Sequence, residues 1–377
     1  MAQIDEKDIN EIRSRADIVS VISRYIPVQK SGKSFRAVCP FHNDHDPSLN
    51  ISPEKQIYKC FVCGEGGNVF TFVQNYEKIS FVEAVKEVAD IVGYHLTYDV
   101  TAKKEIDPHK QALYKVLDEM IRFTMYELNT DIAKEEREYL EKRGLNDSIR
   151  EKFQIGFNPF NNSVYNFLKA KGYKDQDIVS TNIGKLTDSG IQDVFEGRIT
   201  FPIHDINGNP IGFSARTLVK DTNSKYINTN DTEIFHKGTI VYNYHRAKNE
   251  ARRSAKIYLT EGVTDVIAFA RAGIDNCVCT LGTACTREQL LLLKNTTVKL
   301  VFCYDGDEAG QRATYKAASL ARSLGIEVSI IDNKTGKDPD EIIRDSGSEA
   351  LKDLVKKEIS WFEFLIHYLA KHTNFDN

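Results

Sequence analysis

Strand-length apolar segments alternate with amphipathic segments from Lys256 onward, and this alternation constrains the fold more than any other feature of the chain. The amphipathic segments end at a glycine or open with a capping box, as helices do. Strands joined by helices imply right-handed crossovers and a parallel sheet, so this part is expected to be α/β. The expected strands are 256–260, 276–280, 298–304 and 326–331, and the expected helices are 263–272, the segment after Thr286, and 309–323.

Acidic side chains follow two of these strands at the point where each strand ends. Strand 298–304 is followed by Asp305-Gly306-Asp307, and strand 256–260 is followed by Glu261, with Asp265 one helical turn further on. The carboxyl ends of parallel strands meet at one edge of a sheet, so these carboxylates should lie close together. Clustered carboxylates suit hard divalent cations such as Mg²⁺, and metal-assisted phosphoryl chemistry is the expected reaction class.

Each of these acids also has an ordinary structural explanation. Asp-Gly-Asp is common in turns, and Asp265 could complement a helix N-terminus. A later pair is Asp338 and Asp340, of which Asp338 precedes Pro339 as a helix N-cap does. Convergence of several acids on one sheet edge favours the functional interpretation, in which two ions activate a 3′-hydroxyl and neutralise pyrophosphate. Glu261 could alternatively act as a general acid or base.

Four cysteine and histidine residues near the N-terminus have the spacing of a tetrahedral zinc site. Cys39-Pro-Phe-His42 and Cys60-Phe-Val-Cys63 are two knuckle-like pairs separated by seventeen residues. Four protein ligands leave no open position, so one structural Zn²⁺ is expected. His45 is a weaker candidate than His42 for the histidine ligand. The other four cysteines, Cys277, Cys279, Cys285 and Cys303, are expected to be buried bystanders.

Short alternating segments around this motif predict a small β-ribbon, at 35–38, 48–52 and 56–60, preceded by a helical segment over 1–24 and followed by a capped helix over 81–91. Basic residues alternate with aromatic residues along the ribbon, a composition suited to phosphate contact and base stacking. A solvated basic face over an aromatic core is the alternative. The residues expected to bind single-stranded DNA here are Lys30, Lys33, Arg36, Lys59 and Phe61.

Composition places the chain among multidomain proteins of a reducing compartment. The 377 residues suffice for two or three domains, and seven cysteines do not suggest a disulfide framework. We expect a cytoplasmic location, because the N-terminus lacks a signal-peptide pattern and no apolar segment is long enough to span a bilayer. The net charge of −4 means that binding to nucleic acid would depend on local basic patches.

Two acidic segments and the zinc motif resemble known families. Glu261-Gly-Val-Thr-Asp265 and Tyr304-Asp-Gly-Asp-Glu-Ala-Gly310 are similar to the motifs of the toprim domain. The cysteine–histidine motif resembles the zinc ribbon of DnaG-type bacterial DNA primases. The segments between them resemble the RNA polymerase core of that family: Arg143-Gly-Leu145, Phe201-Pro-Ile203, Ile211-Gly-Phe213, Lys225-Tyr226 and Ile234-Phe-His-Lys-Gly238, with the later acidic motif Lys337-Asp-Pro-Asp340.

This resemblance implies residue roles. It implies metal-binding acids and, before them, residues that hold nucleotide phosphates and the template–primer. Val263-Thr264 departs from the bulkier residues usual in the first acidic motif, which could alter nucleotide preference or rate. The implied magnesium or manganese ligands are Glu261, Asp265, Asp305, Asp307, Asp338 and Asp340, and the implied nucleotide and template residues are Arg143, Arg216, Lys225, Tyr226 and Lys237.

The expected function is therefore a DNA primase that uses ribonucleoside triphosphates to synthesise short RNA primers on single-stranded DNA. A toprim nuclease and a zinc-dependent single-strand-binding protein are the alternatives. A replicative helicase and a single-strand-binding protein are the possible protein partners, and no membrane partner is expected. The usual helicase-binding C-terminal domain is expected to be missing, which puts direct contact with the helicase in doubt. The expected domains are a zinc-binding domain at 1–97, a linker at 98–110, a mixed α+β subdomain at 111–252, a toprim domain at 253–336, and the start of a helical subdomain at 337–377.

Overall fold

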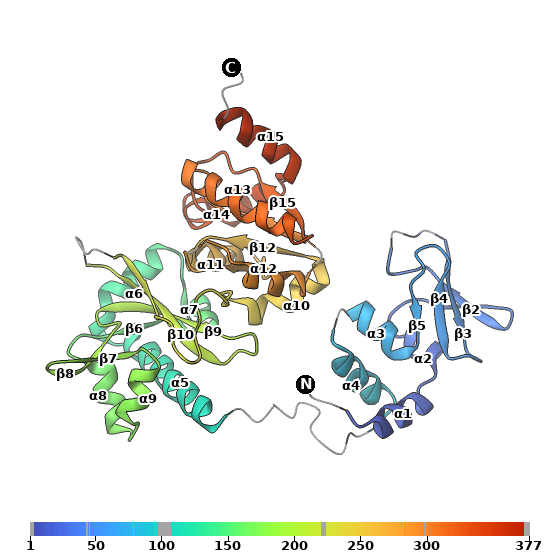
Figure 1. Cartoon of the computed structure of the whole chain (residues 1–377), viewed down its shortest axis with the longest axis horizontal. Helices are drawn as coiled ribbons and strands as arrows, with labels where there is room; N and C mark the ends of the chain where they lie inside the picture. The colour runs from blue at the N-terminus through green and yellow to red at the C-terminus, as the bar shows by residue number, and fades with distance from the viewer. Residues whose placement is uncertain are drawn as a thin grey trace. The chain divides into compact units, whose positions relative to one another are not determined.

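The structure is a computed structural model that divides into two compact units, Met1–Ile106 and Asp107–Asn377 (Figure 1). It describes residues 4–42, 44, 46–77, 79–94, 96, 107–219, 224–282, 284–297 and 299–372. Most of the expected linker at 98–110 therefore lies outside the described residues. Its last residues are ordered, because Asp107 caps the N-terminus of a helix that begins at Pro108.

The first unit begins with two short helices where the sequence predicted one. Helix α1 (Glu6–Arg15) ends because Ala16 adopts an extended conformation. Asp17 then caps α2 (Ile18–Ile22) by accepting a hydrogen bond from the backbone N–H of Ser20. An aspartate that can cap a new helix competes with continuation of the old one, which explains the break.

A five-stranded antiparallel meander follows, and it confirms the expected β-ribbon. Two helices pack against the meander, and the second opens with the capping box expected at Ser80 and Glu83. Tyr58 and Phe72 are fully buried between the sheet and the helices and meet edge to face. The strands are β1 (Gln29–Ser31), β2 (Ser34–Ala37), β3 (Leu49–Ser52), β4 (Ile57–Cys60) and β5 (Gly66–Gly67), and the helices are α3 (Val69–Glu77) and α4 (Phe81–Ile91).

The first half of the second unit packs helices against an antiparallel sheet with strand order β11-β10-β9-β6. The amphipathic segment that opens this half is divided at Asn129 and Thr130. The helices are α5 (Pro108–Leu128), the 3₁₀ turn η1 (Asp131–Ala133), α6 (Lys134–Lys142), α7 (Asp147–Phe153), α8 (Ser163–Ala170) and α9 (Asp175–Ser180). The strands are β6 (Gly156–Asn158), β9 (Arg198–His204), β10 (Pro210–Thr217) and β11 (Tyr226–Asn228), with a separate hairpin of β7 (Gly184–Thr187) and β8 (Gly190–Asp193).

The second half of this unit contains the predicted parallel sheet, with strand order β13-β12-β14-β15-β16. Four strands are parallel, as the alternation predicted, and β16 adds an antiparallel edge strand that the sequence analysis did not foresee. The elements are α10 (Tyr244–Ser254), β12 (Lys256–Thr260), α11 (Val263–Arg271), β13 (Cys277–Cys279), α12 (Arg287–Lys294), β14 (Lys299–Phe302), α13 (Glu308–Ser323), β15 (Glu327–Ile331), α14 (Pro339–Val355), β16 (Glu358–Ser360) and α15 (Trp361–His372).

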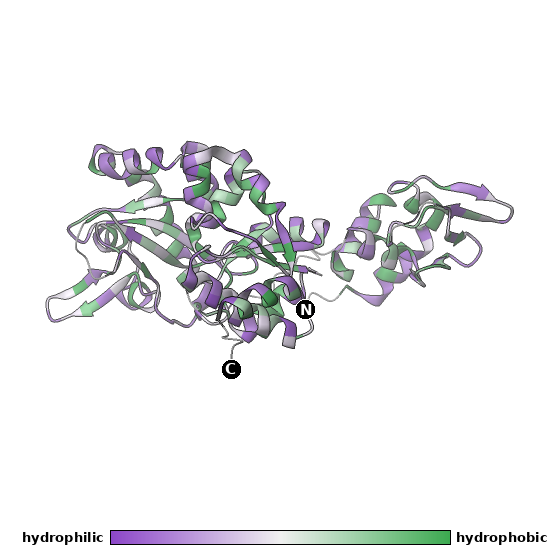
Figure 2. Cartoon of the chain, turned by 90° about the horizontal axis from the view of Figure 1, so that it is seen from above, coloured by the Kyte–Doolittle hydropathy of each residue, from purple (hydrophilic) through white to green (hydrophobic). Residues whose placement is uncertain are grey.

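Helices cover both faces of this sheet. On one face, Tyr258 and Val301 pack against α11 and α14. On the other face, Leu259, Phe302 and Ile330 pack against α10, α12, α13 and α15. Along the helices of both units, hydrophilic and hydrophobic stretches alternate, as expected for helices with one buried face (Figure 2). Within the part of the chain that the structure describes, no helix is long and apolar enough to cross a bilayer.

The strand order places a topological switch point between β12 and β14. The chain leaves β12 through α11 on one face of the sheet and pairs next at β13, on one side. It leaves β14 through α13 on the opposite face and pairs next at β15, on the other side. The two connections diverge, so they leave a crevice at the carboxyl ends of β12 and β14, where ligands bind in open α/β sheets.

The buried face under α13 predicts a measurable loss of stability. We expect Phe302→Ala to lower the free energy of unfolding of the second unit by about 3–5 kcal/mol, because Phe302 is fully buried in the centre of the sheet. Urea denaturation followed by the fluorescence of Trp361, the single tryptophan, measures it. Leu186→Ala is the control, since Leu186 is 76 % exposed in the β7–β8 hairpin and should change stability by less than about 0.5 kcal/mol. Equal effects of the two variants would contradict this account of the core.

Candidate active site and metal centre

The four predicted zinc ligands converge in the first unit. The ligand atoms of Cys39, His42, Cys60 and Cys63 all lie within 4.8 Å of one another. Cys60 ends β4 and Cys63 lies in the turn after it, where the backbone N–H groups of Val62 and Cys63 point at the Cys60 Sγ. Three sulfurs and one imidazole nitrogen in this arrangement fit a closed tetrahedral zinc site. The rival ligand His45 lies outside the described residues.

Asp44 lies next to this cluster and contacts two of its residues, Cys39 and His42. Its Oδ2 accepts hydrogen bonds from the Cys39 backbone N–H at 2.8 Å and from the Ser48 hydroxyl at 2.6 Å. Its Oδ1 lies 3.7 Å from the His42 Nε2, while the Nδ1 of the same ring faces the Cys60 Sγ at 3.9 Å. A carboxylate behind a ligating histidine fixes the tautomer and ring orientation, so the geometry assigns Nδ1 as the metal-facing nitrogen.

The electrostatics of the cluster favour thiolate at Cys60. Burial raises the pKa of this thiol, but hydrogen bonds from the Ser48 hydroxyl and from backbone N–H groups outweigh burial and lower the pKa to about 6. The Ser48 hydroxyl and the Cys39 backbone N–H lower the pKa of Asp44 to about 2. A deprotonated sulfur is the form that binds a metal.

Strand pairing shows on which face of the ribbon the predicted DNA-binding residues lie. Arg36 pairs with Asn50, and Asn50 pairs with Lys59, so the two cations form one exposed row across β2, β3 and β4. Lys30 pairs with Phe35 and lies on the other face of the sheet, while Lys33 lies in the β1–β2 turn. Phe61 is 76 % exposed beside the zinc knuckle.

The predicted acids meet at the switch point of the parallel sheet in the second unit. Glu261 follows β12, and its Oε1 accepts a hydrogen bond from the Asp305 backbone N–H at 3.2 Å. Asp265 lies in the first turn of α11 and accepts from the Gly262 backbone N–H at 2.9 Å. Gly310 allows α13 to start close to Asp305, because a Cβ at Gly310 would overlap the Asp305 carbonyl oxygen.

Asp307 and Asp338 each cap a helix at this edge. One oxygen of Asp307 accepts from the Gly310 backbone N–H at 2.7 Å, and one oxygen of Asp338 accepts from the Glu341 backbone N–H at 2.6 Å. The second oxygen of each carboxylate accepts no hydrogen bond from a described residue and is available to a cation. The capping role considered for Asp338 at the sequence level is therefore real, and Asp307, considered only as a turn residue, caps a helix as well. Both caps coexist with convergence on the edge.

Burial, together with the charges of neighbouring carboxylates, raises the pKa values of Glu261, Asp265 and Asp305. Burial, followed by the charges of Glu261 and Asp338, raises the pKa of Asp305 to about 7. Burial and the charges of Asp307 and Asp338 raise the pKa of Glu261, and burial with Asp338 and Asp305 raises that of Asp265. Five carboxylates at one sheet edge disfavour full ionisation of all of them. The oxygen donor set and this unmet negative charge fit divalent cations.

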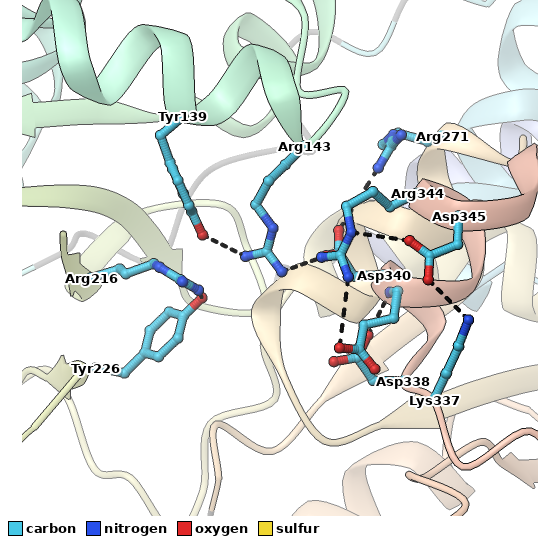
Figure 3. A network of polar contacts seen from close by, with 11 residues as sticks. Tyr139, Arg143, Arg216, Tyr226, Arg271, Lys337, Asp338, Asp340, Arg344 and Asp345 are labelled. Atoms are coloured by element: carbon cyan, nitrogen blue, oxygen red, sulfur yellow. Dashed lines mark hydrogen bonds and ion pairs between the residues drawn. The ribbon is translucent and has the colours of Figure 1, made fainter. Parts of the chain in front are cut away.

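The last predicted metal ligand, Asp340, lies in a different environment. It is 1 % exposed, and its carboxylate forms ion pairs with Arg143, Arg271 and Arg344 (Figure 3). Arg143 comes from the end of α6, in the first half of the unit, so this contact joins residues far apart in the sequence.

The nucleotide-binding candidates separate into two groups. Arg216 stacks on Tyr226 and donates a hydrogen bond to its hydroxyl at 2.8 Å, and it also stacks on Tyr139, which accepts from Arg143 at 2.7 Å (Figure 3). Lys225 is exposed at the start of β11. Lys237 is anchored through its backbone to Asp231 and Gln289. Among the residues that the structure describes, no side-chain contact joins either lysine to the arginine network.

Sequence reasoning missed five residues of these sites. Arg271 and Arg344 surround Asp340, Tyr139 supports Arg143, Glu341 adds charge near Asp305, and Asp44 supports the zinc ligands. Of these, only Asp44 carried a local signal, an acid two residues after the predicted ligand His42. The four remaining cysteines are free and buried, as predicted.

Three protein-family models match successive parts of the chain. The CHC2 zinc finger model matches residues 4–104, the model of the N-terminal domain of the DNA primase catalytic core matches residues 123–248, and a toprim-like model matches residues 258–343. These matches coincide with the zinc cluster, the arginine-bearing half and the acidic edge.

Curated relatives and solved structures agree with these matches. A DNA primase of Listeria monocytogenes is 37% identical over all of this chain, which spans 62% of that relative, and a DNA primase of Aquifex aeolicus is 37% identical over 95% of this chain and 70% of the relative. The crystal structure of the zinc-binding and RNA polymerase domains of the Aquifex aeolicus primase has a TM-score of 0.64 at 36% identity and covers 97% of this chain and 88% of its own. A DnaG primase catalytic domain bound to ssDNA has a TM-score of 0.63 at 32% identity and covers 72% of this chain and 86% of its own.

The support that Asp44 gives to the zinc cluster predicts weaker metal binding in its absence. We expect Asp44→Asn to lower zinc affinity about 10–100-fold, because it removes the charge that orients His42 and weakens the hydrogen bonds to Ser48 and Cys39. Competition with a chromophoric chelator measures the affinity. Asp46→Asn, a neighbouring exposed substitution, is the matched control and should leave it unchanged. Equal affinities of wild type and Asp44→Asn would refute the assignment.

The raised pKa of Asp305 predicts a pH dependence near neutrality. Because a proton and a cation compete for this carboxylate, Mn²⁺ affinity at the acidic edge should fall by about tenfold for each pH unit below about 7. The free energy of unfolding of the metal-free protein should change in the opposite direction. Asp305 binds a proton below about pH 7 in the folded state but only below about pH 4 in the unfolded chain, so the protein should become more stable as pH falls from about 8 to 5. Mn²⁺ titrations by electron paramagnetic resonance between pH 5.5 and 8.5 test the first point. Affinity that is constant over this range would contradict it.

Proposed function

This chain belongs to the bacterial DNA primase family, and from that membership and the acidic edge we propose that it synthesises short RNA primers on single-stranded DNA. The chain spans 62% of the length of the first relatives, whose named activity is that of longer proteins. The observation that carries the proposal is the convergence of Glu261, Asp305, Asp307 and Asp338 at one switch point. The arginine network of the same unit adds the cations that a nucleotide triphosphate requires.

The reaction is nucleotidyl transfer. The 3′-hydroxyl oxygen of the growing strand attacks the α-phosphorus of a ribonucleoside triphosphate, a new P–O bond forms, and the bond to pyrophosphate breaks. Glu261 takes the hydroxyl proton, because burial and the charges of Asp307 and Asp338 raise its pKa and make the carboxylate a stronger base. Magnesium or manganese ions held by Asp305, Asp307 and Asp338 would lower the pKa of the hydroxyl and neutralise the leaving pyrophosphate.

The cationic residues of the second unit hold the substrates in this proposal. Arg143 and Arg216 bind triphosphate oxygens, with Tyr139 and Tyr226 keeping the two guanidinium groups in place. Lys225 and Lys237 contact the backbone of the template–primer as point charges, a role that does not require a rigid geometry. Asp265, fully buried behind the edge, helps to hold the ions through its charge.

The zinc ribbon engages the template. Arg36 and Lys59 lie in one exposed row and present two positive charges on one face of the ribbon, and the exposed ring of Phe61 offers a platform for one base. Lys30 and Lys33 add positive charge at the β1–β2 hairpin. The zinc itself is structural, since its four protein ligands leave no open position. The relative bound to ssDNA supports a single-stranded template.

Primer synthesis with purified protein tests this proposal. With ribonucleotides, Mg²⁺ and single-stranded DNA, wild type should produce short RNA, and Asp307→Ala should reduce the product by at least about 100-fold, because it removes a metal ligand.

Cys60→Ser should lose zinc and template-dependent synthesis together. Arg36→Ala/Lys59→Ala should weaken DNA binding and flatten its salt dependence.

Gel analysis of labelled product and separate analysis of labelled template distinguish the outcomes. Glu308→Gln is the matched control for Asp307→Ala, because Glu308 is the adjacent exposed acid and pairs only with Arg312 among the described residues. Cleavage of the template without synthesis would indicate a nuclease instead. Absence of product from wild type would reject the proposed activity for this chain, and undiminished product from Asp307→Ala would reject the assigned site.

A further inference from the structure

Asp340 is the one acid of the predicted metal set whose two oxygens both face cations of the protein. Its Oδ2 lies 2.5 Å from Arg143 Nη2 and 3.7 Å from Arg344 Nη1, and its Oδ1 lies 3.7 Å from Arg271 Nη1 (Figure 3). The side chain is 1 % exposed. A divalent ion bound to this carboxylate would have to displace a guanidinium group, at a position that is closed to solvent.

Asp338, two residues earlier, has the opposite environment. Its side chain is partly exposed, and one of its oxygens accepts the hydrogen bond that caps α14. Its negative charge helps to raise the pKa values of Glu261, Asp305 and Asp265. Asp338 therefore faces the metal edge, whereas Asp340, in the same helical turn, faces arginines.

The segment Arg143-Gly144-Leu145 is built to complete this arrangement. Arg143 is the C-cap residue of α6, and Gly144 follows it with a φ of +72°, which favours glycine. A Cβ at Gly144 would overlap the guanidinium of Arg271. Gly144 thus both ends α6 and leaves the space in which Arg271 approaches Asp340. Leu145 is buried in the core and anchors the turn.

The charges of the network do not balance. Arg344 is shared with Glu341 and Asp345, so acids of α14 itself neutralise it. Arg143 and Arg271 have only Asp340 as an acidic partner within the described residues, which leaves one positive charge uncompensated. The Nη1 of Arg271 is buried and has no hydrogen-bond partner. A buried donor without an acceptor and an excess positive charge indicate an anion that the protein itself does not supply.

We propose that Asp340 is a positioning residue and not a metal ligand: it holds Arg143 and Arg271, one on each carboxylate oxygen, as a paired receptor for a phosphate group of the nucleotide. The proposal rests on the proposed function for the identity of the anion, and it adds Arg271 to the substrate-binding residues. Asp338 remains a metal ligand. The planar guanidinium groups present donors in a fixed geometry, which suits phosphate oxygens better than a lysine would.

The experiment compares Asp340→Asn with its neighbour Asp338→Asn as the matched control. The number of Mn²⁺ ions bound by zinc-loaded protein is counted by electron paramagnetic resonance, and the Kd of ATP is measured by calorimetry without template. We expect Asp340→Asn to keep the wild-type ion count and to weaken ATP binding by at least about tenfold. Asp338→Asn should bind fewer ions. Arg143→Gln/Arg271→Gln/Asp340→Asn should bind ATP no more weakly than Arg143→Gln/Arg271→Gln, because Asp340 acts only through these two arginines.

Arg271→Gln provides a second test that leaves every carboxylate in place, and thermal melting confirms that each variant is folded. Arg271→Gln should weaken ATP binding with an unchanged ion count. Loss of a bound ion in Asp340→Asn, or wild-type ATP affinity in both Asp340→Asn and Arg271→Gln, would overturn the proposal. If wild type binds ATP as expected but makes no primers, the primase activity is rejected while the positioning role stands, so the two failures are distinguishable.

Discussion

The mutual repulsion of carboxylates at the carboxyl ends of β12 and β14 is the interaction on which the rest of this structure depends. A parallel sheet with its switch point between these strands brings Glu261 and Asp305 together whether or not a cation is present. Burial, followed by the charges of these neighbouring carboxylates, raises the pKa of Asp305 to about 7. A fold that tolerates such repulsion needs rigid support, and helices packed on both faces of the sheet supply it. The binding of divalent cations relieves the repulsion, which couples occupancy of the edge to its stability.

The two predicted metal centres differ in how their ligands are brought together. The zinc ligands lie within 24 residues of one another on one ribbon. Asp44 accepts a hydrogen bond from the Cys39 backbone N–H, and the Ser48 hydroxyl contacts both Asp44 and the Cys60 Sγ. The acidic edge draws on three strand-to-helix junctions spread over the chain from Glu261 to Asp338. Soft sulfur ligands in a closed cluster suit a structural ion, and hard oxygens at an open crevice suit ions that exchange with substrate.

The difference in assembly also explains what the sequence could predict. Spacing alone identified Cys39, His42, Cys60 and Cys63, because their proximity is local and each knuckle has a characteristic geometry. Periodicity predicted β12 and β14, and the rule for parallel sheets then placed Glu261 beside Asp305. No comparable rule existed for the antiparallel strand β16 or for the partner of Arg143, which lies 197 residues away at Asp340. Helix periodicity also continued across Ala16 and Asn129, where capping chemistry ends the helices.

The arginines around Asp340 show why a motif does not by itself assign a role to each of its residues. Asp338 and Asp340 belong to one acidic motif, yet the helical turn that begins at Pro339 points one carboxylate to the edge and buries the other. Burial of an unpaired carboxylate would be unfavourable, so a guanidinium partner is required for the chain to fold around it. Once Arg143 serves as that partner, the end of α6 is held against α14, and the half of the unit with the antiparallel sheet is fixed relative to the acidic edge. In the role proposed for Asp340, the same ion pair would both stabilise the fold and position a cation for a nucleotide phosphate.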